Sequence, residues 1–473
     1  MSSAAPLTRV ALLLAGLTLP VMSSYASAAG DESALLKRGE YLARAGDCAA
    51  CHRAPEDDGP AYAGGYVIES PLGDIVASNI TPSNQYGIGD YSEEDFARVL
   101  TEGERPDGSQ LYPAMPYTAY RGLMDEDIHA LYAYFQQGVA PVDEPIAETN
   151  LSFPFNLRAG MIFWNLLFLD DPYTPQASHD AKVDRGHYLV DTLGHCGSCH
   201  TPRNALMAQD SSRYLAGADV EGWHAPNITS AASGIGRWSE ENLATYLKTG
   251  HVPGLAQAGG GMADAVDHSL RYLTDEDLAS MAAYLKQVPA IETGPALAVN
   301  EPREKTSMPD PAEIEPVLGN DPQVQTRADT LDGRRLYQAA CASCHQRDGQ
   351  GTQDHFYPSL VHNTATRGGQ ANNLVMAILK GVDRQTEAYH VAMPAYEDQL
   401  TDAQVAAISN HVLQKFGNAE LTVDAQQVAA WRQGGSTPWW VSAMPWLLAA
   451  GAMILLGGLG GAFYRWRRHA ARY

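Results

Sequence analysis

Cys-x-x-Cys-His occurs three times in the sequence, at residues 48–52, 196–200 and 341–345, and the three copies use all six cysteines. On a short helix, residues i and i+3 lie on one face. The two thiols of one copy can therefore bond to the two vinyl groups of one porphyrin, and the histidine that follows can bind its iron. This is the attachment pattern of c-type haem. The sequence predicts three covalently bound haem c groups, attached through Cys48, Cys51, Cys196, Cys199, Cys341 and Cys344, with His52, His200 and His345 as iron ligands.

Paired cysteines at this spacing have other uses. They could form a local disulfide, or supply half of a zinc site that a second pair completes to four ligands. A thioredoxin-like redox pair has the same spacing but belongs to a βαβ unit, and no such pattern surrounds these motifs. None of these alternatives explains why a histidine follows the second cysteine in every copy.

A haem iron bound by one histidine has a sixth coordination position, and the residue there determines the chemistry. A methionine thioether closes the position and suits electron transfer, whereas an empty position suits the binding of a small molecule. Each unit has a methionine in a stretch that we predict to be non-helical: Met115, Met262 and Met393. Proline follows the first and the third of these and sets a turn. Met262 lacks the proline and has His251 and His268 as rivals.

The first two units are internal repeats. Arg-Gly-x-Tyr-Leu stands before the motif at residues 38–42 and again at 185–189, and Asn-Ile-Thr follows it at 79–81 and again at 227–229. The third unit keeps Gly333 and Tyr337 but lacks the middle of the repeat.

A helix is predicted at the end of each unit, because apolar residues recur there at helical spacing. The stripes are Ile128, Leu131, Tyr132 and Phe135; Leu278, Met281, Ala282 and Leu285; and Val405, Ile408 and Val412. Thr401 and Gln404 form a capping box before the third of these helices. We interpret the helical Met281 and Met376 as core residues. One amphipathic helix before the haem motif and one at the end of the unit describe a small α domain with the porphyrin in its core.

These patterns predict an all-α fold of three haem domains in tandem, followed by one C-terminal transmembrane helix. The predicted segments are a signal peptide (1–29), domain 1 (30–140), a connector (141–178), domain 2 (179–288), an acidic, proline-rich linker (289–325), domain 3 (326–417), a polar stalk (418–437), the transmembrane helix (438–464) and a basic cytoplasmic tail (465–473). The connector contains an apolar run at 161–169, too short to cross a bilayer. We expect it to be buried between domains, with a partner-docking patch as the alternative.

The two ends of the chain indicate its compartment. Arg9, the apolar run 10–19 and the small residues 26–28 are typical of a cleaved secretory signal, although an uncleaved anchor is the alternative. Residues 439–464 carry no charge, and four arginines follow within the last nine residues. By the positive-inside rule, the C-terminus is cytoplasmic and the haem domains face the periplasm of a bacterial inner membrane.

The net charge of −23 argues against nucleic acid as a partner. An acidic surface of this kind serves solubility or steers a basic partner.

With these motifs and their spacing, the sequence resembles the tri-haem cytochrome c subunit of membrane-bound periplasmic dehydrogenase complexes, whose haem domains are similar to class I cytochrome c. The resemblance covers essentially the whole mature chain. It implies that a separate catalytic subunit of the PQQ, flavin or molybdenum type oxidises an alcohol, an aldehyde or a sugar acid. It also implies that this chain is not an enzyme on its own and that it carries the electrons from haem to haem and on to ubiquinone. By the same resemblance, Met115, Met262 and Met393 are the second iron ligands.

Two other functions stay open at this stage. A haem c subunit of a terminal oxidase would also be anchored in the membrane. A self-contained haem enzyme such as a peroxidase would need one iron without its methionine. We find no nucleotide-binding loop, no Ser/His/Asp arrangement and no catalytic carboxylate pair in the sequence.

Overall fold

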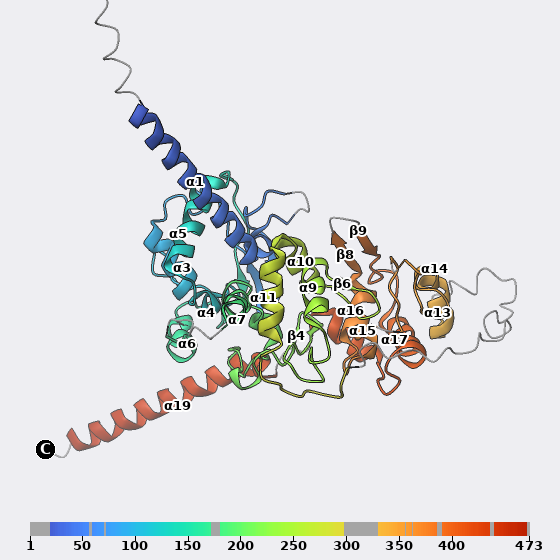
Figure 1. Cartoon of the computed structure of the whole chain (residues 1–473). Helices are drawn as coiled ribbons and strands as arrows, with labels where there is room; N and C mark the ends of the chain where they lie inside the picture. The colour runs from blue at the N-terminus through green and yellow to red at the C-terminus, as the bar shows by residue number, and fades with distance from the viewer. Residues whose placement is uncertain are drawn as a thin grey trace, which may run out of the picture.

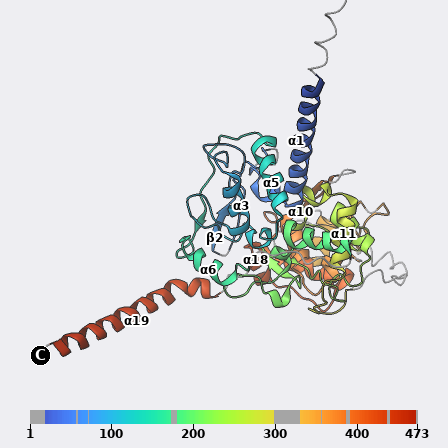
Figure 2. The same cartoon turned by 60° about the vertical axis from the view of Figure 1, so that its left-hand side comes forward.

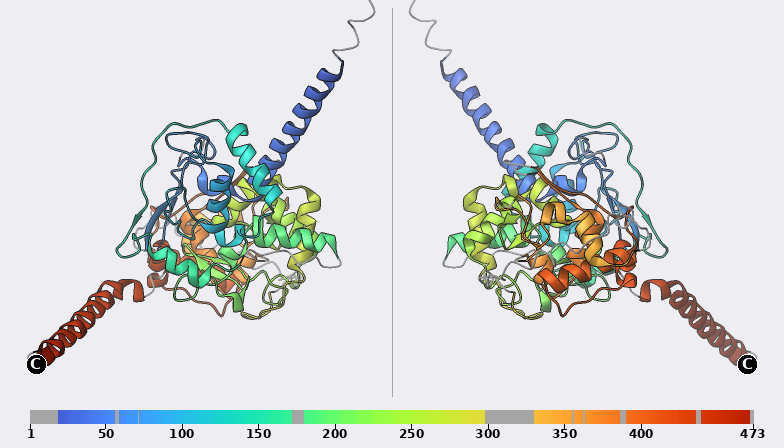
Figure 3. Two further views of the ribbon diagram at one scale, coloured as in Figure 1. Left: turned by 90° about the vertical axis from the view of Figure 1, so that its left-hand side faces the viewer. Right: turned by 90° about the vertical axis from the view of Figure 1, so that its right-hand side faces the viewer.

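The computed structural model describes residues 19–55, 59–70, 72–171, 180–297, 330–354, 356–361, 363–385, 390–435 and 439–470. It shows three mainly helical units in a row, coloured blue to cyan, green to yellow, and orange to red (Figure 1). Helix α19 (Trp439–Ala470) and the first turns of α1 (Leu19–Ala45) project from the body in different directions (Figure 3). Residues 1–18 of the predicted signal peptide and most of the predicted acidic linker lie outside the described residues.

The elements follow the repeat. Unit 1 contains α1, α2 (Cys48–His52), β1 (Val67–Ile68), β2 (Gly73–Val76), α3 (Glu93–Glu102), α4 (Tyr117–Tyr120), α5 (Asp125–Ala133) and the π-helix η1 (Tyr134–Gly138), and β3 (Asn150–Leu151) and α6 (Gly160–Phe168) follow it. Unit 2 contains α7 (Ala181–His187), the π-helix η2 (Tyr188–Leu193), α8 (Gly197–His200), η3 (Ser211–Arg213), β4 (Ala218–Val220), β5 (Trp223–Ala225), α9 (Glu240–Thr249), β6 (His251–Val252), β7 (Ala256–Gln257), α10 (Gly261–His268), η4 (Leu270–Tyr272) and α11 (Asp275–Leu285). Unit 3 contains α13 (Gly333–Ala340), α14 (Ala342–His345), α15 (Thr364–Arg367), α16 (Asn372–Lys380), β8 (Val382–Gln385), β9 (His390–Met393), α17 (Asp402–Phe416) and α18 (Ala425–Arg432), before α19.

Short antiparallel strands accompany the helices. In the described residues, β1, β2 and β3 form one three-stranded sheet, and the other strands form three two-stranded pairs. The all-α prediction is therefore confirmed in part: helices form the framework of each unit, and the strands lie in the loops between them.

In each unit, the first helix crosses the helix that was predicted for the end of the unit (α5, α11 or α17, called the last helix below), and a glycine lies at the crossing. A Cβ atom at Gly39 in α1, Gly186 in α7 or Gly333 in α13 would overlap a carbonyl oxygen of the last helix in the same unit: that of Ala130, Ser280 or Ala407, respectively. Glycine lets two helix backbones approach more closely than any other residue. This close crossing explains why the glycine of the Arg-Gly-x-Tyr-Leu repeat persists in unit 3.

The apolar core is divided into two clusters rather than three. The first combines buried residues of units 1 and 2, from Leu42 to Val288, and the second runs from Leu336 to Val428 in unit 3. The capping box of Thr401 and Gln404 begins α17, as predicted. Val428 is fully buried, so the segment expected to be a polar stalk contains a helix, α18, that packs on unit 3.

Units 1 and 2 are joined by a reciprocal pair of hydrogen bonds. In each unit, the repeat arginine binds an aspartate of the last helix: Arg38 Nε lies 2.9 Å from Asp127 Oδ1, and Arg185 Nε lies 2.8 Å from Asp277 Oδ1. The repeat tyrosine instead donates to the aspartate of the other unit. Tyr188 Oη lies 2.7 Å from Asp127 Oδ2, and Tyr41 Oη lies 2.5 Å from Asp277 Oδ2. The same residues contact each other in both directions, as in a two-fold symmetric dimer.

Unit 3 is attached to unit 2 in a different way. The backbone N–H of His224 in β5 donates to the Asn373 side chain, which donates back to the His224 carbonyl. Arg384 of β8 is fully buried and donates to the Gly250 carbonyl at 2.6 Å. Tyr41 lies two residues after Gly39, whereas the residue two positions after Gly333 is Arg335. Tyr337 therefore occupies a different position in its helix from that of Tyr41. Unit 3 therefore lacks the tyrosine that joins units 1 and 2.

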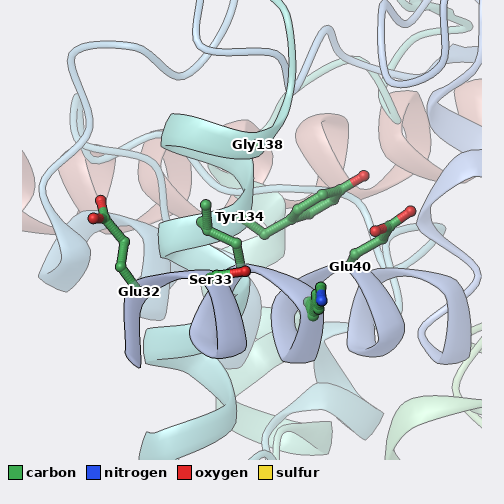
Figure 4. A pocket seen from close by; sticks show the side chains of 7 residues that line it. Glu32, Ser33, Glu40, Tyr134 and Gly138 are labelled. Carbon is green, nitrogen blue, oxygen red and sulfur yellow. The ribbon is translucent and has the colours of Figure 1, made fainter. Parts of the chain in front are cut away.

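A shallow hollow lies between α1 and η1. Figure 4 shows Tyr134 of η1 over α1, between Glu32 and Glu40. None of the cysteines, histidines or methionines predicted to hold haem lines it, so it is separate from the predicted sites.

The reciprocal hydrogen bonds can be tested by substitution. Tyr188→Phe removes the donor to Asp127 and keeps the ring, and Tyr41→Phe does the same at the symmetric position. A hydrogen bond to a charged group contributes about 1.5–3 kcal/mol, so each variant should lower the free energy of unfolding by about that amount. Denaturant unfolding of the holoprotein, followed by haem absorbance, measures it. Tyr86→Phe, at an exposed tyrosine, is the control, and equal stability of all three variants would contradict the prediction.

Candidate haem sites

Each cysteine motif forms a short helix soon after the first helical segment of its unit, which in unit 2 is α7 continued by η2. These helices are α2, α8 and α14, and the preceding helix ends within a few residues of each. All six cysteines lie in the described part of the chain, and none forms a disulfide. Among the described residues, no group of three or more His, Cys, Asp or Glu side chains is arranged to hold a metal ion. The geometry therefore gives no support to the disulfide and zinc alternatives.

The three motif histidines share one hydrogen bond. The Nδ1 atoms of His52, His200 and His345 lie 2.6, 2.7 and 3.0 Å from the backbone carbonyl oxygens of Ser78, Pro226 and Pro358, respectively. A carbonyl can only accept, so Nδ1 carries the proton and Nε2 keeps its lone pair. Burial also lowers the pKa of His52, which favours the neutral ring. A neutral imidazole with its other nitrogen fixed in this way is the form that binds a metal.

The Asn-Ile-Thr repeat holds the carbonyl that orients the histidine. In unit 1, the Asn79 side chain accepts from the backbone N–H and hydroxyl of Thr81 at 2.8 and 2.7 Å, and donates to the Val142 carbonyl at 2.8 Å. Both residues are buried, and Ser78 is the residue before this turn. The repeated sequence alone does not indicate this role. The signal that points to it is the equal distance of Asn79 and Asn227 from the motif histidine of their unit.

Unit 2 contains the same turn. Asn227 Oδ1 accepts from the backbone N–H and hydroxyl of Thr229 at 2.9 and 2.7 Å, and Asn227 Nδ2 donates to the Ile291 carbonyl at 2.7 Å. Pro226, whose carbonyl accepts from His200, precedes it. Unit 3 reaches the same histidine geometry through a shorter connection, with Pro358 only 13 residues from His345.

The three methionines occupy different local structures. Met115 lies in the bend before α4, and Met393 is the last residue of β9. Met262 is in the first turn of α10, so the prediction of a non-helical stretch is wrong there. All three are half-buried, and each packs against the apolar cluster that its unit's first motif cysteine also contacts. Met281 and Met376 are buried, as expected for core residues.

Comparison with known proteins identifies the fold of the three units. The model of the family described as cytochrome c matches residues 36–138, 183–289 and 331–415, which together make up more than half of the chain. The chain belongs to the cytochrome c family. The three haem domains predicted from the motifs are thereby confirmed.

Curated relatives resemble this cytochrome over nearly its whole length. The fructose dehydrogenase cytochrome subunit of Gluconobacter japonicus is 46% identical, over 97% of this chain and 95% of the relative. The gluconate 2-dehydrogenase cytochrome c subunit of Pantoea cypripedii is 37% identical, over 87% and 92%. The cytochrome c subunit of the quinone alcohol dehydrogenase of Gluconobacter oxydans is 37% identical, over 92% and 91%. The resemblance to cytochrome c subunits of dehydrogenase complexes is confirmed, and these subunits transfer electrons rather than catalyse.

The residues of this cytochrome fit a covalently bound haem. Each site combines two unpaired thiols, a histidine with a fixed Nδ1 proton and a methionine at the edge of an apolar cluster. In domain 2, the Trp238 indole N–H is buried and has no acceptor among the described residues. A haem has propionate carboxylates, which are acceptors of the kind that this donor lacks. When bound, haem iron supplies one-electron redox chemistry, with a potential that the axial ligands and burial adjust.

The sites of domains 1 and 2 adjoin. Arg53, next to His52, forms an ion pair of 3.5 Å with Asp264 in α10, the helix that carries Met262. The ring of His195, just before the second motif, meets the ring of Tyr120 in α4 at a centroid distance of 5.6 Å, in edge-to-face geometry. A residue next to each motif therefore contacts a helix of the other domain that contains the predicted methionine, as α10 does, or follows it, as α4 does.

The turn that orients the histidine can be tested in one domain at a time. Asn79→Ala removes the acceptor of the Thr81 bonds and the donor to the Val142 carbonyl. It therefore leaves buried groups unpaired and should cost about 1–3 kcal/mol of stability. It should also shift the reduction potential of one haem, because the hydrogen bond to His52 loosens. Asn227→Ala is the matched variant for domain 2 and should shift a different haem. Redox titration resolves the three potentials, and an unchanged set in both variants would disprove the role of the turn.

Proposed function

We propose that this cytochrome carries electrons through three covalently bound haem c groups, from a periplasmic dehydrogenase catalytic subunit to ubiquinone. The observation that carries the proposal is the threefold repetition of one site. Two thiols and a histidine of fixed tautomer recur in three domains that all match the cytochrome c family. A chain that binds one substrate needs one site of this kind, whereas a chain that conducts electrons over a distance needs several.

The contact between domains 1 and 2 supports transfer within the chain. Arg53, next to the first motif, pairs with Asp264 of domain 2, and His195, next to the second motif, contacts Tyr120 of domain 1. The cores of the two domains form one cluster. A rigid interface keeps the two haems at a constant separation. Electrons then pass between them without a diffusional step.

The relatives support a sugar or a sugar acid as the substrate of the catalytic partner. The 46% identical relative serves fructose dehydrogenase, and a 37% identical one serves gluconate 2-dehydrogenase. Oxidation of an alcohol is the second candidate, because a relative of equal 37% identity serves the quinone alcohol dehydrogenase. In both cases the catalytic subunit, with a PQQ, flavin or molybdenum cofactor, removes the electrons, and this chain receives them.

Helix α19 supports a membrane anchor. Its segment Trp439–Phe463 has a mean hydropathy of 1.8 and is long enough to cross a bilayer. Arg465, Arg467 and Arg468 follow directly, which favours a cytoplasmic C-terminus and haem domains in the periplasm. Export by the signal peptide at residues 1–29 agrees with this orientation. Ubiquinone dissolves in the same bilayer, so an anchored cytochrome is close to its acceptor.

The native complex provides the experiment. The holoprotein, purified from membranes, should contain three covalent haems per chain and should copurify with a catalytic subunit. Addition of that subunit's sugar substrate should reduce all three haems, and a ubiquinone analogue should then reoxidise them. Haem content, identification of the copurified chain by mass spectrometry, and rapid-mixing spectroscopy measure these steps. Fewer than three haems, or substrate oxidation by this chain alone, would refute the proposal.

The methionine ligands make a separate prediction. Loss of a thioether opens the sixth position of one iron and lowers its potential. Met115→Ala, Met262→Ala and Met393→Ala should therefore each remove about a third of the methionine–iron charge-transfer absorbance and slow quinone reduction. Met124→Leu, at an exposed methionine of domain 1, is the control and should leave the band intact. A variant that keeps the full band would rule out that methionine as a ligand.

A further inference from the structure

Helix α6 exposes large apolar side chains to a degree unusual for a helix outside a membrane. Ile162 is 56% exposed, Phe163 71%, Leu166 82% and Leu167 67%. No residue of α6 is buried, so the prediction that this run is buried between domains is wrong. An exposed apolar patch of this kind marks an interaction surface.

Polar contacts hold α6 in this orientation. Asn165 receives a hydrogen bond of 2.7 Å from the Tyr117 hydroxyl and donates one of 2.9 Å to the Gln110 side chain, both in domain 1. The Trp164 indole N–H donates to the Leu206 carbonyl of domain 2 at 2.9 Å. The helix is therefore fixed to the body through its amide and indole groups, and its four exposed apolar side chains point outward.

The exposed face of α6 continues toward the predicted membrane anchor. Figure 2 shows α6 beside the first turn of α19, and the rings of Phe155 and Trp440 lie 6.2 Å apart in edge-to-face contact. Three further apolar residues nearby are exposed: Phe153 and Leu157 precede α6 in the chain, and the Leu206 carbonyl accepts the Trp164 hydrogen bond. An anchor that leaves the body here brings the bilayer surface to the same place.

We propose that α6 lies flat in the outer surface of the membrane, with its apolar face in the lipid. Nine residues are too few to span a bilayer but enough for an interfacial helix. Residues 160–168 contain no charged side chain, so burial among acyl chains leaves no charge to be desolvated. Tyr117, which holds α6, is two residues from Met115. The membrane contact therefore sets domain 1, rather than domain 3, against the lipid. This inference rests on the proposed function only in that α19 spans the membrane.

Single added cysteines can test the location of α6, because the six native cysteines are used for haem attachment. Leu166→Cys places a spin label on α6, Leu331→Cys on an exposed site of domain 3, and Leu456→Cys on α19. The full-length holoprotein is reconstituted in phosphatidylcholine–phosphatidylglycerol nanodiscs. Power saturation with oxygen, which concentrates in lipid, and with a water-soluble nickel chelate then reports the surroundings of each label. Unchanged haem spectra verify that each variant is folded.

We expect the oxygen-to-nickel accessibility ratio to be several-fold higher at positions 166 and 456 than at position 331. A water-like ratio at 166 with a lipid-like ratio at 456 would overturn the inference and leave the proposed anchor intact. A water-like ratio at 456 would overturn the anchor itself. The measurement is repeated with the catalytic subunit bound. Protection of position 166 from both reagents would mean that protein covers α6, which also overturns the inference.

Discussion

The hydrogen bond from the motif histidine to a backbone carbonyl is the constraint on which each domain depends. A histidine that follows two covalent attachment points has little positional freedom, but its ring can still rotate and exchange tautomers. The carbonyls of Ser78, Pro226 and Pro358 remove that freedom by accepting the Nδ1 proton. Domains 1 and 2 hold the carbonyl with a buried asparagine–threonine turn. Domain 3 achieves the same geometry with a shorter loop, so the hydrogen bond is retained while the sequence around it is not.

The second organising contact is the reciprocal bonding between domains 1 and 2. Each buried aspartate faces an arginine of its own domain and a tyrosine of the other. For Asp277, burial acts to raise the pKa, but the hydrogen bonds from Arg185 and Tyr41 outweigh it, and the pKa is lowered. The carboxylate therefore stays ionised at neutral pH and keeps its charge-assisted bonds. Domain 3 has glutamine, Gln404, in the corresponding helix position, and this neutral side chain cannot form the same pair.

The terminal helices and the internal repeat could be predicted from the sequence because each leaves a strong local pattern, and the motif that predicts haem attachment is equally local. Cys-x-x-Cys-His is specific in spacing and composition, and Thr401 with Gln404 makes a recognisable helix start. The reciprocal tyrosines could not be predicted in the same way. Tyr41 and Asp277 are 236 residues apart, and no periodicity links them. The helical position of Met262 could not be predicted either, because three glycines precede it and favour a loop.

The apolar run of α6 shows why hydrophobicity alone did not predict its surroundings. A short apolar stretch has the same composition whether protein or lipid covers it, and only contacts separate the two. In α6 the few polar groups, Trp164 and Asn165, point to the body, while the aliphatic side chains point away. This reverses the arrangement of a helix that packs on a protein core, where apolar residues face inward. The reversal is expected when the outer surroundings are less polar than the protein surface, and α19 begins at the same place. The orientation of α6 and its closeness to α19 therefore agree with the proposal that one membrane surface passes beside domain 1.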